Sequence, residues 1–486
     1  MIAKIIALPT IASLLTSFLA HALPASNPQS PFLASSSRVG PQRFDNEQVW
    51  RLNLTALDSA DKDNLMNIVK IMDLDVWHAS PSQLDVRLDA SQTAHLRQVI
   101  PSSMPFEPMI PDLQSAIERS SVIHTSLSQE TWDVSTIDTP FHDSYHTLDD
   151  LYSFGDQLQR YFNGYKGVKI ESFVVGTTFQ DRQIRGWKAS IDTDGGTGNQ
   201  TFGKKKQELE FVLQSGQHAR EWIGPSTALY YLHWLLLAAT SGHSPEALLA
   251  LRTFTFTVVP TINPDGYVYS QEHSRMWRKN RQYLGVDNCV GIDLNANWGY
   301  KWRKPQHNNP CAETYAGKAA FEAFETRAMA DYLLSANGPA PLYEREGDDE
   351  QFNLLKPKSK RIRAFVDLHS YGQLFMYPFA HSCEDFPFDA ENLMEASLGV
   401  AKAMRQRDGE AYMTGQACDL TYRAPGDSID FAYGTTDVRW SFSTELRDTG
   451  VYGFLLPASY IRPTGEEISA GLTFLAKFIY TTEIAG

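Results

Sequence analysis

The chain of 486 residues has little cysteine, an excess of acidic over basic side chains, and few long apolar runs. It contains 4 cysteines, and its 43 Lys and Arg residues face 57 Asp and Glu residues, which gives a formal net charge of −14. This balance excludes a general electrostatic attraction to nucleic acid or to an anionic membrane surface. Beyond the N-terminus, no apolar run approaches the ~20 residues of a membrane-spanning helix. We therefore expect a soluble protein without nucleic-acid partners or a membrane span.

The N-terminal 22 residues have the composition of an export signal. Lys4 supplies one positive charge, an apolar stretch runs from Ile5 to Leu19, and residues 20–22 are Ala-His-Ala, the small-x-small pattern of a signal-peptidase site. We therefore predict that residues 1–22 are a signal peptide and that the mature protein is secreted to the outside of the cell.

Secretion has consequences for the cysteines and for two asparagines. In an oxidising compartment the four cysteines should pair, and four cysteines allow three connectivities. We expect neighbours along the chain to join, giving the pairs Cys289–Cys311 and Cys383–Cys418. Asn53 and Asn199 each begin an Asn-x-Thr triplet that a secreted protein can glycosylate.

Patterning divides the rest of the chain into a small domain and a large one. Residues 23–46 are rich in Pro, Ser and Asn without apolar periodicity, which is typical of a linker. Residues 47–119 show the order βαββαβ of a small open sandwich with its helices on one sheet face. Residues 120–139 are polar, and with the basic Arg119 beside them they are predicted to be an exposed, cleavable connection. Residues 140–486 form the large domain.

The large domain has an α/β pattern. Residues 209–213 are an apolar run of the kind found at the centre of a sheet. Residues 192–206 and 337–360 are predicted to be surface insertions. The other predicted strands are 168–175, 253–259, 364–369 and 440–446, and the predicted helices are 148–162, 223–237, 319–335, 391–405 and 466–480.

Two predicted strands end beside residues that can bind a metal. The strand at 209–213 leads into His218, with Glu221 three residues later, and a second strand ends in His369. Open α/β sheets bind ligands at the carboxyl ends of their strands, and two His with one carboxylate and an open fourth position is the pattern of a catalytic zinc site. From the spacing alone, two unrelated histidines held by backbone partners are the other interpretation.

Six motifs in a fixed order support the metal site. They are His218–Ile223 (HAREWI), Asn263–Tyr267 (NPDGY), Trp277–Asn280 (WRKN), Gly291–Asn295 (GIDLN), Asp367–Tyr371 (DLHSY) and Glu445–Gly450 (ELRDTG). Together they resemble the motifs of secreted metallocarboxypeptidases of the carboxypeptidase A type. The resemblance covers His142–Gly486, and Gln48–Asp112 is similar to the family's activation propeptide. It implies a mixed central sheet flanked by helices on both faces.

The resemblance also implies a set of catalytic residues. Asp293 would hold the ring of one metal-binding histidine. Glu445 corresponds to the family's general base, and Arg278 to the cation that polarises the scissile carbonyl and stabilises the oxyanion. The other interpretations are a surface ion pair of Glu445 with Arg447 and a helix-surface Arg278. The implied ligands of Zn²⁺, with a fourth position open to water, are His218, Glu221 and His369.

Four residues are implied to bind substrate: Arg220, Asn295, Tyr422 and Ile429. Tyr422 matches a mobile tyrosine that closes over bound peptide, although it could also be a packing residue. Ile429 occupies the base of the specificity pocket, where an apolar side chain favours apolar or aromatic C-terminal residues. The nearby Asp427 either caps a turn or selects a basic residue.

One position departs from the family pattern. After Asn295 the family has an arginine that binds the terminal carboxylate of the substrate in a bidentate manner, and this chain has Ala296. Loss of one partner of a desolvated charge pair typically costs about 2 to 5 kcal/mol. Lys301 or Arg303 could supply the missing cation.

We therefore expect a monomeric zinc metallocarboxypeptidase that is secreted as a zymogen and cleaved by an activating protease. Its expected substrates are peptide or protein C-termini with apolar or aromatic residues. Inactive fungal relatives with disrupted catalytic residues occur in the family, but the retained Glu445 sets this chain apart from them. Ala296 favours the alternative, a zinc-retaining pseudoenzyme with a peptide-binding or cell-wall role. A metal-dependent amidase acting on substrates without a free carboxylate would tolerate Ala296.

Overall fold

The structure is a computed structural model that describes residues 40–100, 104–120, 123–124, 131–191, 209–286, 288–304, 309–335 and 361–485. Pro41–Gly486 form one compact unit. The predicted signal peptide, most of the predicted linker, both predicted insertions and Asn199 lie outside the described residues.

A four-stranded antiparallel sheet with two helices comes first in the chain. Its strand order is β2-β3-β1-β4, so β2 is an edge strand. Asp58 and Asp89 cap the helices by accepting hydrogen bonds from backbone N–H groups three residues on, which satisfies donors that a helix N-terminus leaves open. The predicted βαββαβ order is confirmed by β1 (Gln48–Asn53), α1 (Ser59–Ile71), β2 (Asp75–Ala79), β3 (Gln83–Leu88), α2 (Ala90–Val99) and β4 (Phe106–Ile110).

The rest of the unit is built on a mixed eight-stranded sheet with the order β15-β14-β16-β13-β9-β10-β8-β7. The central strands β16, β13, β9 and β10 run parallel, whereas β8 and β7 on one side and β14 on the other join in antiparallel pairs. The strands are β7 (Val168–Thr177), β8 (Gln183–Ile191), β9 (Leu209–Ser215), β10 (Phe254–Val259), β13 (Ile362–Ser370), β14 (Leu374–Tyr377), β15 (Met413–Gln416) and β16 (Trp440–Leu446).

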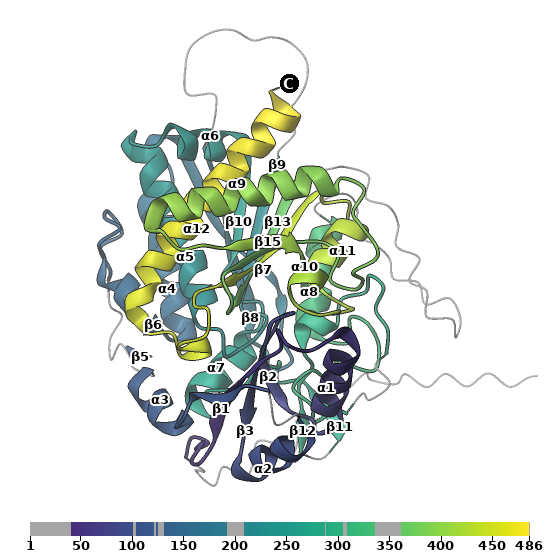
Figure 1. The fold of residues 1–486 in the computed structure, drawn as a ribbon. Coiled ribbons are helices and arrows are strands. Elements are labelled where there is room, and N and C mark those ends of the chain that lie inside the picture. Colours follow the sequence, from purple (N-terminus) through teal and green to yellow (C-terminus); the bar gives the residue numbers. More distant parts are fainter. Residues whose placement is uncertain are drawn as a thin grey trace, which may run out of the picture. The chain divides into compact units, whose positions relative to one another are not determined.

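Helices cover both faces of this sheet (Figure 1). In β9, Phe211 and Leu213 pack into one core cluster with α4, α5, α9 and α12, while Val212 between them packs into a second cluster with α8 and α11. This alternation follows from the two-residue period of a strand, and it confirms the predicted sheet with helices on both faces. The helices are α4 (Leu148–Phe162), α5 (Ile223–Ser241), α6 (Pro245–Thr253), α7 (Pro264–Glu272), α8 (Phe324–Ser335), α9 (Ala390–Asp408), α10 (Ala417–Leu420), α11 (Ser428–Gly434) and α12 (Ile461–Ile479).

The segment between the two sheets is exposed only in part. Helix α3 (Leu113–Ser120) ends with the exposed Arg119 in its last turn. A short strand β5 (Ile123–His124) pairs with β6 (Tyr145–His146). Trp132 and Val134, however, are buried in the large core, so the end of the predicted connection is packed against the protein.

Both predicted disulfide bonds lie in the large domain. Cys289–Cys311 and Cys383–Cys418 are bonded, which confirms the predicted pairing of neighbours. The first bond joins β12 (Cys289–Val290), which follows β11 (Tyr283–Val286), to the next loop. In the described part of the chain, every helix is too short or too polar to cross a bilayer.

Candidate active site

Four predicted site residues gather at one edge of the eight-stranded sheet. His218 and Glu221 follow the carboxyl end of β9, and His369 is the penultimate residue of β13, which pairs with β9. Glu445 lies on β16, directly opposite His369 in the parallel register of these strands. Because the three strands run parallel, their carboxyl ends meet at one edge, where α/β sheets bind ligands. The fold thus brings together motifs that are far apart in sequence.

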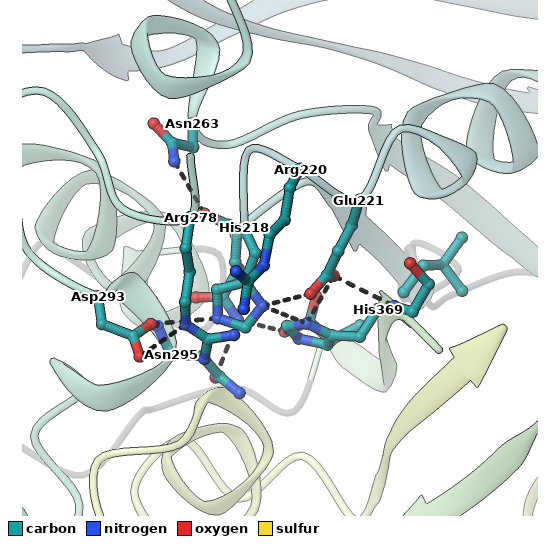
Figure 2. A network of polar contacts seen from close by, with 12 residues as sticks. His218, Arg220, Glu221, Asn263, Arg278, Asp293, Asn295 and His369 are labelled. Atoms are coloured by element: carbon teal, nitrogen blue, oxygen red, sulfur yellow. Dashed lines mark hydrogen bonds and ion pairs between the residues drawn. The ribbon is translucent and has the colours of Figure 1, made fainter. Parts of the chain in front are cut away.

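Three of these side chains present their ligand atoms to one point (Figure 2). The Nδ1 atoms of His218 and His369 are 3.2 Å apart, and the carboxylate oxygens of Glu221 lie 2.7 Å and 3.3 Å from them. Tetrahedral zinc with ligands at ~2.0 to 2.1 Å holds its ligand atoms ~3.3 Å apart. In the described ranges, these buried residues are the one group of three or more potential metal ligands. The donor set therefore fits a zinc ion.

An aspartate lies beside each histidine ring. Nε2 of His218 lies 3.1 Å from Oδ1 of Asp293, and Nε2 of His369 lies 3.2 Å from Oδ2 of Asp367. The hydrogen bond to Asp293 favours the tautomer of His218 that carries its proton on Nε2 and leaves Nδ1 for a metal. Nε2 of His369 lies within ion-pair distance of Asp367 but makes no hydrogen bond with the described residues. Burial opposes the charge on Asp293, but Arg278 and His218 outweigh it and hold the pKa of Asp293 well below its usual range.

A carboxylate and a guanidinium face the ligand group. Together with it, Glu445 and Arg278 line a cavity of about 100 Å³. Oε2 of Glu445 is buried and has no hydrogen-bond partner among the described residues. Burial raises the pKa of Glu445 to about 8, and a cation bound nearby would lower it because it attracts the carboxylate. Arg278 donates from Nη2 to Oδ2 of Asp293 at 3.0 Å, which holds its guanidinium at the cavity wall.

The cavity includes some of the predicted substrate-binding residues. Asn295, Tyr422 and Asp427 line it, and Tyr422 is 42% exposed. Ile429 is not among the lining residues, because its side chain is fully buried in the core cluster around α8 and α11. The sequence offers no signal for the apolar lining, since small apolar side chains have no chemical signature. On the large domain that lining includes Met376, Ala380, Ala417 and Ala424.

Among the described residues, neither of the two cations expected to compensate for Ala296 lies at the cavity. Lys301 and Arg303 are exposed, and neither lines the cavity. A carboxylate lies there instead, since Nδ2 of Asn295 donates to Oδ2 of Asp427 at 2.8 Å. The other oxygen of Asp427 accepts from a backbone N–H and caps α11. This confirms the interpretation of Asp427 as a turn cap and also places its side chain at the cavity.

Arg220 is held by the N-terminal sheet. Its Nη1 donates to both carboxylate oxygens of Asp75, at 2.9 Å and 3.0 Å, and its Nη2 to the carbonyl oxygen of Val76 at 3.3 Å. The guanidinium also lies over the ring of Phe454, 4.3 Å from its centroid. Arg220 therefore cannot contact a substrate while Asp75 holds it.

The edge strand β2 lies over the cavity. Val76–Ala79 are part of the lining. Nδ1 of His78 lies 3.3 Å from the carbonyl oxygen of Tyr371, and the hydroxyl of Tyr371 donates to Asp85 on β3 at 2.9 Å. Arg51 on β1 donates to the carbonyl oxygen of Gly450 at 3.0 Å. The N-terminal sheet thus covers the cavity with β2 and is held to the large domain by contacts of β1, β2 and β3.

Replacing Asp75 with alanine should loosen this cover. Removing one partner of a buried ion pair leaves Arg220 uncompensated, which costs about 3 to 5 kcal/mol. We expect hydrogen exchange of the β2 amides to become about 100-fold faster or more, as mass spectrometry of peptic fragments would show. Asp45→Asn is the matched control, because Asp45 pairs with Arg43 on the surface and makes no contact with Asp75 or Arg220. Unchanged exchange in Asp75→Ala would show that the ion pair does not hold the cover.

The same ion pair predicts a pH dependence of the cover. Burial alone would raise the pKa of Asp75, but Arg220 and Arg87 outweigh it and lower the pKa. A lowered pKa means that the pair stabilises docking fully above the unfolded value of about 3.9, and that the stabilisation is lost as the pH falls through the folded value. We expect β2 exchange, corrected for its intrinsic pH dependence, to rise below about pH 4 in the wild type and not in Asp75→Ala.

The fold and the site define a class of protein. A mixed sheet that presents His-x-x-Glu, a distant His and a buried Glu at the ends of its parallel strands is the architecture of a metallopeptidase. The family model described as zinc carboxypeptidase matches residues 160–471. The chain belongs to the zinc carboxypeptidase family, and the predicted resemblance is confirmed.

Similar curated proteins are named as inactive metallocarboxypeptidases. "Inactive metallocarboxypeptidase ecm14" of Talaromyces marneffei is 31% identical over 480 residues, covering 92% of this chain and 75% of that protein. The protein of the same name in Saccharomyces cerevisiae is 32% identical over 420 residues, covering 85% of this chain and 87% of its own length.

Solved structures share the fold over most of the chain. A crystal structure of carboxypeptidase A from Helicoverpa armigera aligns with a TM-score of 0.73 at 20% identity, covering 91% of this chain and 100% of that one. Thrombin activatable fibrinolysis inhibitor aligns with a TM-score of 0.71 at 24% identity, covering 90% and 100%. Bovine thrombin-activatable fibrinolysis inhibitor, solved in complex with tick carboxypeptidase inhibitor, aligns at 28% identity with a TM-score of 0.56, covering 70% and 99%.

Proposed function

We propose that this protein is a zinc-dependent carboxypeptidase, secreted as a zymogen, that hydrolyses bonds next to the C-termini of peptides and proteins. The observation that carries the proposal is the joint placement of the ligand group, Glu445 and Arg278 around one cavity. Each of these residue types has a distinct task in peptide hydrolysis, and a protein that only binds peptides has no need of the buried Glu445.

The chain's own residues would divide the reaction as follows. His218, Glu221 and His369 would hold the zinc ion, which would serve as a Lewis acid towards water and the scissile carbonyl. Glu445 accepts the proton of the attacking water and passes it to the leaving amine. Arg278 donates to the oxygen on which negative charge develops, while Asp293 keeps its guanidinium at the cavity wall.

The cavity supports a preference for apolar leaving residues. Its lining on the large domain includes small apolar side chains, which leave room for a large substrate residue. Among these are Ala380, Ala417 and Ala424, together with the larger Met376.

The N-terminal sheet supports synthesis as a zymogen. Strand β2 covers the cavity, and Asp75 forms an ion pair with Arg220. The N-terminal sheet must therefore move away before a peptide can bind in the cavity. The exposed Arg119 in the last turn of α3 is a site where an activating protease with basic specificity can cut. Secretion by the N-terminal signal, action as a monomer and glycosylation at Asn53, which is exposed, complete the proposal.

A second candidate function is that of a zinc-retaining pseudoenzyme that binds peptide tails or serves at the cell wall. It is favoured by Ala296, which replaces the arginine that would bind a terminal carboxylate, and by the name "inactive metallocarboxypeptidase" of similar proteins. Glu445 and Arg278 favour the enzyme.

Hydrolysis assays separate the two candidates. The full-length protein is treated with trypsin, and release of the C-terminal residue is measured from N-blocked dipeptides that end in phenylalanine, with free and with amidated termini. We expect cleavage of at least one form, loss of cleavage with 1,10-phenanthroline, and its recovery on adding Zn²⁺. Zinc-loaded, cleaved protein that turns over neither form would establish the pseudoenzyme.

A further inference from the structure

The charges that face the cavity do not suit an anionic substrate terminus. Among the described residues that line it, Arg278 is the one Arg or Lys, and it is already paired with Asp293. Besides the ligand group, two carboxylates face the space, those of Glu445 and Asp427. A free carboxylate entering the cavity beside Asp427 would meet a like charge or lose its water without gaining a cation, and either outcome is unfavourable.

Asp427 is fixed in its place by the two loops that meet there. Gly426 has a φ of +86°, and an added Cβ would lie 2.5 Å from the carbonyl oxygen of Ala296. The N–H of Trp298 donates to the carbonyl oxygen of Gly426 at 3.0 Å. This close backbone approach holds Asp427, the next residue, against the 295–297 segment. Its carboxylate is therefore a rigid part of the cavity wall.

Asn295 commits one of its two amide N–H groups to Asp427. Its Nδ2 donates to Oδ2 of Asp427 at 2.8 Å, and its Oδ1 accepts from Nε2 of Gln217 at 2.9 Å and from the N–H of Ser428 at 3.0 Å. The amide is thus oriented by three partners, and its second N–H is a neutral donor that does not replace the charge of an arginine. Each carboxylate oxygen of Asp427 accepts one hydrogen bond and has a second lone pair. These lone pairs can accept an N–H from a ligand at this end of the cavity.

We propose that Asp427 makes the site selective for leaving groups whose terminal group donates hydrogen bonds, such as a C-terminal carboxamide, over those that end in a free carboxylate. This inference rests on the proposed hydrolytic function and names its substrate class. Burial raises the pKa of Asp427 to about 8, and a cation bound at the ligand group would lower it because it attracts the carboxylate. In its ionised form the side chain of Asp427 accepts an N–H from the substrate terminus and repels a carboxylate. Loss of a hydrogen bond to a charged group corresponds to a change in affinity of about tenfold or more.

The first test measures binding and does not depend on turnover. N-acetyl-L-phenylalaninamide and N-acetyl-L-phenylalanine differ only in the terminal group, and calorimetry compares their affinities for zinc-loaded, full-length Glu445→Gln protein, before and after trypsin treatment. We expect the amide to bind about tenfold more tightly or better. Adding Asp427→Asn should reduce this ratio to near one, because asparagine keeps the helix cap and removes the charge. Asp419→Asn, which removes an exposed charge on α10, is the matched control and should leave the ratio unchanged.

The second test measures kcat/KM for N-blocked dipeptides ending in phenylalaninamide and in phenylalanine, with Glu445 intact. We expect the same preference for the amide, and we expect Ala296→Arg combined with Asp427→Gly to reverse it. A binding preference for the amide without any turnover would leave the inference standing and overturn the proposed hydrolysis. Faster cleavage of the free acid by the wild type would overturn the inference and leave the proposed hydrolysis standing.

Two further outcomes would overturn the inference. If neither probe binds at millimolar concentration after trypsin treatment, the cavity has no terminus-binding subsite of this kind. If the free acid is preferred at pH 6 and the preference disappears at pH 9, Asp427 is protonated and donates to a carboxylate. An amide preference that is present at both pH values supports the inference.

Discussion

Replacement of His369 with alanine should abolish zinc binding and, with it, all hydrolysis. The remaining ligand atoms belong to His218 and Glu221, and two protein ligands do not hold zinc in a site built for three. Even changes in the partners of metal ligands weaken binding by about 10 to 100-fold, so we expect a loss of about 100-fold or more. Elemental analysis of the purified protein after dialysis against competing chelator measures the zinc that remains.

His78→Ala is the matched control for this experiment. Its ring lines the same cavity but contacts a backbone carbonyl and not the ligand group, so this variant should keep one zinc per chain. Both proteins should have the same far-ultraviolet circular dichroism as the wild type. One tightly bound zinc per chain in His369→Ala would refute the assignment of the ligand group.

The meeting of the ligand residues at one edge of the sheet could be predicted, because the apolar runs in the sequence show where the strands end. The apolar runs before His218 and before His369 marked two buried parallel strands, and parallel strands end at the same edge of a sheet. The partner of His218 followed from the family's motif order, and the structure places Asp293 as that order implies, whereas Asp367 beside His369 was not predicted. The disulfide pairing also followed from the order of the cysteines.

Element boundaries were predicted less well, for identifiable reasons. Helix α8 begins five residues later than the expected residue 319, because Phe321 has a φ of +56° that a right-handed helix does not accept. Helix α12 begins five residues before the expected residue 466, since Pro463 lies in the first turn, where proline is tolerated. Strands β8, β14 and β15 were missed, and β14 and β15 have only four residues each, too few to show a period.

Contacts between distant segments could not be predicted from the sequence. Asp75 and Arg220 are 145 residues apart, and nothing in either motif indicates that they pair. Ile429 was expected in the cavity and lies in the core, while Asp427, two residues earlier, lines the cavity. The cap at the start of α11 determines which of them faces inwards, and a cap's orientation depends on the loop against which it packs.

Replacement of Glu445 with glutamine should lower kcat without releasing zinc. Glutamine has the same shape but cannot accept the proton of the attacking water, and general-base catalysis contributes about 10² to 10⁴-fold. We expect kcat to fall by that factor on whichever dipeptide the wild type cleaves, with KM nearly unchanged, because the residue acts mainly in the transition state. Steady-state kinetics with parallel zinc analysis measures both quantities.

Glu466→Gln serves as the matched control, since Glu466 is paired with Arg407 on the surface between α12 and α9. This variant should retain the wild-type kcat. A lower kcat in Glu445→Gln then results from the change in the cavity and not from the loss of a carboxylate in general. A Glu445→Gln protein that binds zinc and cleaves at the wild-type rate would show that Glu445 is not the base. A fall in kcat accompanied by loss of zinc would instead make Glu445 a residue that supports the metal site, because a base that acts only on water leaves the three ligands undisturbed.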